Sequence, residues 1–219
     1  MTASVSHVEQ QVPAASQLPV PFSIAISRQR GAGGSRLAAE LGALLNWAVY
    51  DRELIARIVA DTGVSKELVA NVDERHASWI LECTEAFTGA PTISEAKYVH
   101  RLIQVIASLA AQGNCIFVGR GAGFLLPPAT RLHVRLIAPL PDRIVEVAKE
   151  QHQSEHAASR YIQQVDAERQ AFVTEHFHQD PQQEEAYDLV LNTVRLGSHA
   201  SAMLIVQALQ CLQSRVGAL

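Results

Sequence analysis

The stretch from Ile24 to Ala38, IAISRQRGAGGSRLA, constrains the fold of this chain more than any other. Its first three residues are apolar and predict a buried strand, and Ser35 opens a run with leucines at helical spacing. A glycine-rich loop lies between them. A strand, a glycine loop and a helix N-terminus form a phosphate-binding geometry, because backbone amides and the helix dipole favour negative charge there. A tight connection that binds nothing is the alternative.

The loop departs from the phosphate-binding motif G-x-x-x-x-G-K-[ST] at two positions. When Gly33 is taken as the second glycine, Arg28 stands at the first glycine position and Gly34 at the lysine position. Ser35 keeps the hydroxyl position. The lysine of that motif normally reaches the outer phosphates. Since the loop carries three arginines, we expect at least one of them to direct its guanidinium toward the phosphates: Arg28, Arg30 or Arg36.

The length allows one domain with an ample core, over residues 21–219, and the composition is ordinary. A flexible arm over residues 1–20 precedes the domain. The net charge of −4 does not indicate nucleic acid as a partner. The arm holds no apolar run, so we expect neither a secretory signal nor a membrane anchor there. Three widely separated cysteines indicate a reducing compartment, and the predicted location is the cytoplasm.

Short apolar strands alternate with helical patterns along the chain. We expect strands at residues 24–26, 47–50, 114–118, 132–138 and 187–192, and helices from residues 35, 52, 94, 142, 154 and 198. We expect Ser198 to cap the last helix. This order predicts a five-stranded parallel sheet with helices on both faces. Ligands of such sheets bind at the carboxyl ends of the strands, where residues 27–35, Asp51, Arg120 and the loop at Thr193 fall.

Five segments in this order resemble the cytidylate kinase-like family of P-loop nucleoside monophosphate kinases. They are ISRQRGAGGSRLA, VYDRELI, FVGRGA, DAER and YDLVLNT, and with the last helix they span residues 21–210. The loop without a lysine is similar to a divergent branch whose loops read R-x-x-G-S-G-G. The resemblance implies an α/β P-loop NTPase fold with a helical acceptor-binding insert at about residues 52–112 and a helical lid at about residues 142–180.

The resemblance further implies transfer of the γ-phosphoryl group of ATP to a nucleoside monophosphate, with Mg²⁺, and CMP or dCMP as first choice. The partner is then a small-molecule nucleotide, with no nucleic acid and no membrane, and a homo-oligomer stays open. Two alternatives remain: a nucleotide-binding regulatory module without turnover, and a kinase for another small molecule. The lid helix carries only Lys149 after residue 143, which favours the first of these.

The site residues follow from this resemblance. The donor phosphates would lie on Gly31, Ala32, Gly33, Gly34, Ser35 and Arg36, and Ser35 would be the Mg²⁺ ligand. The expected catalytic arginines are Arg30, Arg36 and Arg120. The expected acceptor-binding residues are Asp51, Arg52, Arg120, Asp166 and Arg169.

Each of these residues also has a structural interpretation. Ser35 and Asp51 are typical helix N-caps. Arg120 lies between two glycines and is also typical of a surface turn. Asp166 and Arg169 have the spacing of an exposed ion pair on one helix. The histidines of the lid region lack metal-binding spacing and indicate a solvated surface: His152, His156, His176 and His178.

Overall fold

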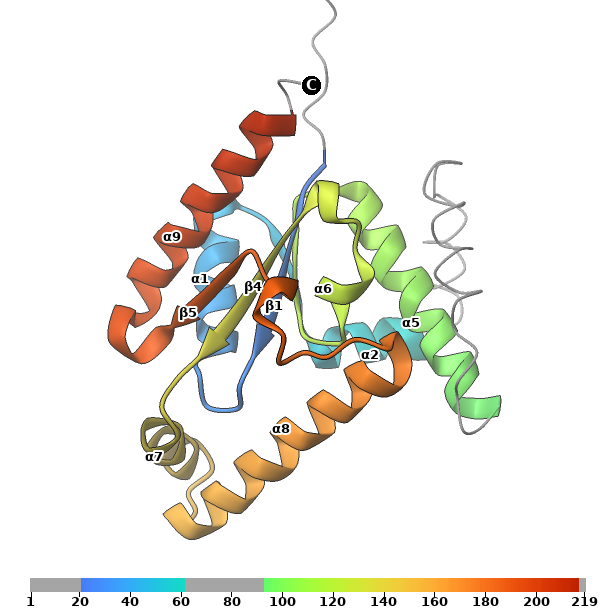
Figure 1. The fold of residues 1–219 in the computed structure, drawn as a ribbon. Helices are drawn as coiled ribbons and strands as arrows, with labels where there is room; N and C mark the ends of the chain where they lie inside the picture. Colours follow the sequence, from blue (N-terminus) through green and yellow to red (C-terminus); the bar gives the residue numbers. More distant parts are fainter. Residues whose placement is uncertain (1–20, 62–92, 217–219) are drawn as a thin grey trace, which may run out of the picture.

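The computed structural model describes residues 21–61 and 93–216, which form a sheet between two layers of helices (Figure 1). The elements are β1 (Ser23–Arg28), α1 (Gly34–Leu45), β2 (Ala48–Tyr50), α2 (Arg52–Ala60), α5 (Ile93–Gln112), β3 (Cys115–Val118), α6 (Ala122–Leu125), β4 (Arg131–Ile137), α7 (Leu140–Glu150), α8 (Glu155–Phe177), β5 (Leu189–Asn192) and α9 (Thr193–Val216). Single 3₁₀ turns occur at Pro128–Thr130 and Glu184–Ala186.

The sheet has the order β2-β3-β1-β4-β5, and all neighbouring strands are parallel. This confirms the predicted five-stranded parallel sheet. β1 lies at its centre, with Ile26 opposite Val118 of β3 and Val134 of β4. The loop after β1 therefore leaves the middle of the sheet at its carboxyl edge.

The alternation of side chains along β1 supplies two cores, one on each face of the sheet. Ile24 and Ile26 pack with Leu37 and Leu41 of α1 and with buried residues of α9. Ala25 faces the other way and joins a cluster formed by α2, α5, α6 and β3. Since both faces are covered by helices, the strands read as continuous apolar runs in the sequence.

Two helices cover the carboxyl edge of the sheet. α8 crosses beneath the strand ends in Figure 1, and α7 lies beside it. This pair has a small core of its own, built on Val147, Ala158 and Ile162. The hydroxyl of Ser154 accepts a hydrogen bond from the amide of Ala157 and caps α8. The pair falls within the residues predicted as the lid.

The long last helix begins at about residue 198, as predicted, but a short helical turn precedes it. α9 spans Thr193–Val216, and Gly197, with φ 76° and ψ 164°, divides it into that first turn and the helix that follows. The side chain of Asn192 accepts a hydrogen bond from the amide of Arg195 in the first turn. Ser198 instead donates to Oε2 of Glu40 at 2.6 Å, so its hydroxyl joins α9 to α1.

Two further differences concern short or polar segments. α6 was not expected, because four residues are too few to show a helical period. α8 begins at Glu155, one residue after the predicted start, and runs to Phe177. The arm at residues 1–20 and the middle of the predicted insert, residues 62–92, lie outside the described residues. In the part of the chain that is described, no helix combines the length and apolar character that a membrane span requires.

Candidate functional site

The glycine loop ends in an uncapped helix N-terminus. The N-cap of α1 is Gly33, with φ 70°, and no side chain caps it or places an acid in the first turn. Within the described ranges, the amides of Gly34, Ser35 and Arg36 have no hydrogen-bond partner. Unpaired amides at the positive end of a helix attract anions. The predicted phosphate site thus has the backbone that it requires.

Ser35 is the second residue of α1 and does not cap it, so the structural interpretation of Ser35 as an N-cap is wrong. Its side chain is exposed. Mg²⁺ in phosphate-transfer sites is held by few protein groups, several waters and the substrate phosphates. In residues 21–61 and 93–216, no cluster of three or more His, Cys, Asp or Glu side chains could hold a metal. The exposed hydroxyl of Ser35, beside amides without a described partner, would suit a Mg²⁺ ion shared with nucleotide phosphates, and this role of Ser35 stays a prediction.

A cavity of about 390 Å³ lies at the carboxyl ends of β1, β3 and β4, with α8 as its wall. Five arginines line it: Arg28, Arg52, Arg120, Arg135 and Arg169. No described carboxylate forms an ion pair with any of them. Two acids also line the cavity, Asp166 and Glu168. Because none of these five arginines forms an ion pair with a described carboxylate, their charges favour an anion in this cavity.

The structure brings four of the five predicted acceptor-binding residues to this cavity, namely Arg52, Arg120, Asp166 and Arg169. Asp51 does not line it. Its carboxylate accepts a hydrogen bond from the amide of Leu54 at 2.8 Å and caps α2, which is its structural interpretation. The loop residues 31–36 also lie outside the cavity lining, at its side.

Arg120 combines an unusual backbone with an unpaired side chain. Its φ of 56° is uncommon for a residue other than glycine. The guanidinium lies over the rings of Tyr98, at 5.7 Å, and Phe172, at 6.0 Å. Its buried Nε atom has no hydrogen-bond partner among the described residues. Burial lowers the pKa of Arg120, so a bound anion would relieve the cost of its charge.

Arg169 and Arg28 meet at the same edge. Nη1 of Arg169 donates to the backbone carbonyl of Arg28 at 2.8 Å. Burial is the main cause that lowers the pKa of Arg169. Burial, followed by the charges of Arg169, Arg52 and Arg30, lowers the pKa of Arg28 to about 9. The arginines thus destabilise one another until an anion binds between them.

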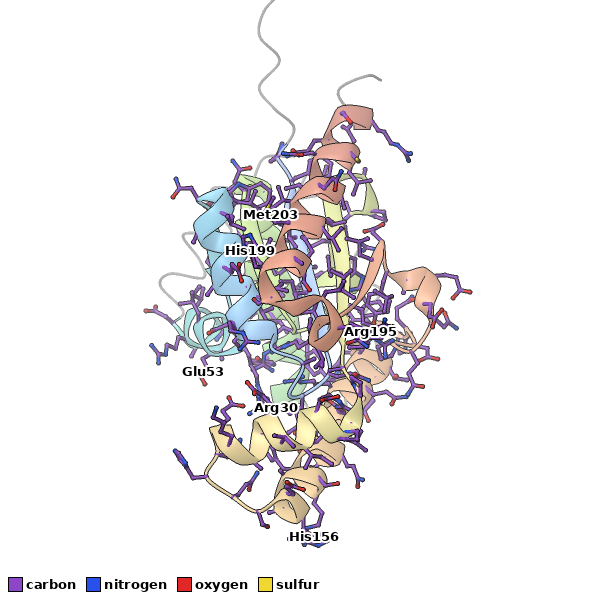
Figure 2. All side chains as sticks on the ribbon, turned by 90° about the vertical axis from the view of Figure 1, so that its left-hand side faces the viewer. Arg30, Glu53, His156, Arg195, His199 and Met203 are labelled. Carbon is purple, nitrogen blue, oxygen red and sulfur yellow. The ribbon has the colours of Figure 1, made fainter. Side chains whose placement is uncertain are left out.

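Arg30 points to the lid rather than to the cavity. Its guanidinium pairs with Glu150 at 2.8 Å and lies 5.5 Å from the ring of Tyr161. Figure 2 shows Arg30 where the loop meets α7. Arg36 is exposed. Its Nη2 atom lies close to Gly33, at 3.6 Å from the position that a Cβ on this glycine would occupy. The catalytic roles of Arg30 and Arg36 remain predictions.

Asp166 joins the loop to the lid. Its Oδ1 accepts a hydrogen bond from the amide of Arg30 at 2.7 Å, and its Oδ2 accepts one from Nη1 of Arg143 at 2.6 Å. The same Nη1 donates to the carbonyl of Arg30 at 3.2 Å. Gly31, with φ 86°, is required beside this contact, because a Cβ there would lie 2.8 Å from the carbonyl oxygen of Arg143. Loop and lid are thus fixed to each other through backbone groups.

We expect Asp166→Asn to lower the free energy of unfolding by about 1–2 kcal/mol, because it weakens two hydrogen bonds at once. Urea unfolding measures this change, and hydrogen exchange of the Arg30 amide should accelerate. Glu168→Gln is the matched control, since among the described residues that carboxylate accepts a hydrogen bond only from the side chain of Gln164. Equal stability of the Asp166→Asn protein and the wild type would contradict the joining role.

Three residues on one face of β4 were not predicted. Arg131, His133 and Arg135 alternate with apolar residues, and that alternation in an otherwise buried strand was the available signal. The buried His133 donates from Nδ1 to the carbonyl of Ala186 at 2.8 Å. Its Nε2 therefore accepts from the hydroxyl of Ser27, at 3.0 Å, and Ser27 lines the cavity.

The lid histidines divide into two kinds. His152, His156 and His178 are exposed, as a solvated surface requires, and Figure 2 shows His156 at the end of the lid remote from the sheet. His176 is buried and packs edge-on against Phe172 at 4.7 Å. The prediction of a solvated position is therefore wrong for His176, because α8 turns that face toward the core.

Comparison with solved structures supports this architecture. A protein from Eubacterium ventriosum ATCC 27560, described as uncharacterized, matches with a TM-score of 0.65 and 16% identity, over 86% of this chain and 98% of that chain. TT1252 from Thermus thermophilus matches with a TM-score of 0.50 and 18% identity, over 87% of this chain and 97% of that chain. At these identities the likeness shows the fold alone.

A curated protein is also similar in sequence. The uronate isomerase of Corynebacterium glutamicum is 24% identical over 165 residues, which are 72% of this chain and 32% of that protein. This chain thus spans about a third of the length of that relative.

The family comparison covers most of the fold. The model of the cytidylate kinase-like family matches residues 23–195, from β1 through the loop, the cavity and the lid to the first turn of α9. This match and the parallel sheet with its glycine loop confirm the P-loop NTPase fold and a kinase-like architecture. The chain belongs to the cytidylate kinase-like family.

Proposed function

We propose that this protein transfers the γ-phosphoryl group of ATP to a nucleoside monophosphate, with CMP or dCMP as the first acceptors to test. One observation carries the proposal: five arginines that form no ion pair with a described carboxylate line a cavity beside an uncapped helix N-terminus. Two anion-binding features side by side suit two phosphorylated substrates. Phosphoryl transfer depends mainly on positioning and on neutralisation of charge, which such groups supply.

In this proposal the two features have separate roles. The amides at the start of α1 would hold the donor phosphates, and Ser35 would hold a Mg²⁺ ion, which would neutralise phosphate charge. Arg120 and Arg169 bind the phosphate of the acceptor in the cavity. Aromatic rings that line the same cavity, those of Phe124, Phe172 and Tyr187, offer surfaces for a base.

The test is a turnover assay of the purified full chain with ATP, Mg²⁺ and a panel of CMP, dCMP, UMP, AMP and GMP. We expect ADP and a nucleoside diphosphate to form in equal amounts, fastest with CMP or dCMP. A reaction without acceptor measures ATP hydrolysis alone. Absence of acceptor-dependent ADP formation across the panel would contradict the proposal.

A nucleotide-binding module without turnover is the second candidate. Gly34 in place of the lysine favours it, as do the contacts that join Arg30 to the lid. Such a module would bind ATP in calorimetry and transfer no phosphoryl group to any member of the panel. ADP formation only with a phosphorylatable molecule that is not a nucleotide would instead indicate a kinase for another small molecule.

A further inference from the structure

The side chain of Arg28 occupies the space that Gly34 leaves open. A Cβ on residue 34 would lie 2.9 Å from Cγ of Arg28 and 3.4 Å from its Cβ and Cδ. By the alternation of β1, Arg28 follows Ile24 and Ile26 on the face that α1 covers. A lysine at position 34 and this conformation of Arg28 therefore exclude each other. Arginine at position 28 and glycine at position 34 are the two departures from G-x-x-x-x-G-K-[ST], and this conformation of the arginine requires the glycine.

The guanidinium of Arg28 lies at the end of β3. Its Nη1 is 2.0 Å from where a Cβ on Gly119 would lie, so only glycine, here with φ 82°, leaves room for it. Arg28 and Gly119 both line the arginine cavity. The side chain thus spans the distance from the start of α1 to the cavity, between the two proposed phosphate positions.

The charge of Arg28 has no ion-pair partner among the described residues. The nearby charges are those of Arg169, Arg52, Arg30 and the more weakly acting Asp51. A partly buried cation among other cations is unfavourable in the free protein. An anion bound beside it would reverse this effect.

The other two arginines of the loop are placed differently. Arg30 is engaged by Glu150 and the ring of Tyr161. Arg36 is exposed at the rim of the loop. We infer that Arg28 is the cation that contacts the outer phosphates of the donor nucleotide, in place of the lysine that position 34 lacks, and that Gly34 is required for this replacement. This inference rests on the proposed function, since that function supplies the donor.

Isothermal titration with ATP and Mg²⁺ tests it, using Arg28→Met, Arg36→Met and the exposed, remote Arg215→Met as control. We expect Arg28→Met to weaken ATP binding by roughly 10- to 100-fold, the range of one charge-assisted contact. We expect a smaller change for Arg36→Met and none for Arg215→Met. ATP affinity of Arg28→Met equal to that of the wild type, or a larger loss for Arg36→Met, overturns the inference.

Thermal unfolding gives a second readout that a structural arginine would not give. Without ligand, Arg28→Met should have a Tm equal to or above that of the wild type, because an unpaired charge has been removed. With ATP its rise in Tm should be smaller than that of the wild type. A lower Tm without ligand together with a normal ATP-induced rise would show that Arg28 is structural.

A pair of substitutions tests whether the two departures depend on each other. The double variant Arg28→Gly with Gly34→Lys has the sequence GQRGAGKS at residues 28–35, which matches the motif. It should bind ATP roughly 10-fold more tightly than Arg28→Gly alone. Gly34→Lys alone should bind weakly, because the new side chain meets Arg28. A double variant that folds but gains no affinity over Arg28→Gly overturns this dependence.

Failure of the inference and failure of the proposed function are distinguishable. If the wild type binds neither ATP nor inorganic tripolyphosphate, both are wrong. If it binds ATP and turns over the panel while Arg28→Met does the same, only the inference is wrong. If Arg28→Met loses ATP binding and the wild type transfers nothing, the inference stands and the proposed phosphoryl transfer is wrong.

Discussion

Arg120→Ala should raise the KM for the acceptor monophosphate by roughly 10- to 150-fold, which corresponds to about 1.5–3 kcal/mol, and leave the KM for ATP nearly unchanged. Arg120 lines the cavity, its buried Nε has no hydrogen-bond partner among the described residues, and two aromatic rings hold the guanidinium in place. Its loss removes a charge-assisted contact with the acceptor phosphate and none with the donor.

The backbone of Arg120 calls for a second variant. Alanine is strained at φ 56°, whereas asparagine adopts this conformation readily. Arg120→Asn therefore removes the charge and keeps the turn, and it should show the same KM ratio. Arg101→Ala, an exposed arginine of α5, is the matched control. An equal rise in both KM values for Arg120→Asn would contradict a role confined to the acceptor.

Acid should destabilise the protein through His133. Burial, followed by the charge of Arg131, lowers the pKa of His133 from its ordinary 6.5 to about 3, although its hydrogen bond to Ala186 opposes this shift. Between these pH values the unfolded chain binds a proton that the folded chain does not. The contribution of His133 to the free energy of unfolding is therefore complete above pH 6.5. Below that pH the free energy of unfolding falls by up to about 1.4 kcal/mol for each unit of pH.

Urea unfolding at pH 7.5, 6.5, 5.8 and 5.0 measures this slope above the range in which most carboxyl groups titrate. His133→Gln should unfold with a smaller pH dependence in this interval, even if it is less stable throughout. His178→Gln, at an exposed site, should keep the slope of the wild type. An unchanged slope in His133→Gln would show that other groups carry the acid sensitivity.

Hydrophobic pattern determined the fold of this chain. The strands are short apolar runs and the helices have a clear period, so their order alone implied a parallel sheet with a ligand edge. The glycines of the loop likewise indicated its course, because positive φ angles at Gly31 and Gly33 are easy only for glycine. Local signals of this kind do not depend on what packs against them.

Local pattern was less reliable at the ends of helices. Serine is a typical N-cap residue, yet the hydroxyl of Ser198 donates a hydrogen bond to Glu40. The side chain of Asn192 caps the first turn of α9. Asp51 does cap α2, and a helix N-cap was one of the two roles considered for it beside acceptor binding. A side chain that can hydrogen-bond nearby or far away is assigned only when its distant partners are in place.

The roles of the charged residues were decided by tertiary contacts. Arg28, Arg30 and Arg36 are equivalent in sequence, but Arg30 meets Glu150 from α7 and Arg28 meets the end of β3. Asp166 was expected to bind the acceptor. It lines the cavity, but its carboxylate accepts hydrogen bonds from the amide of Arg30 and the guanidinium of Arg143. A long flexible side chain takes its position from segments that are distant in the sequence. The sequence therefore indicated a charged ligand edge, and only the folded chain determined which arginine of the loop faces the cavity.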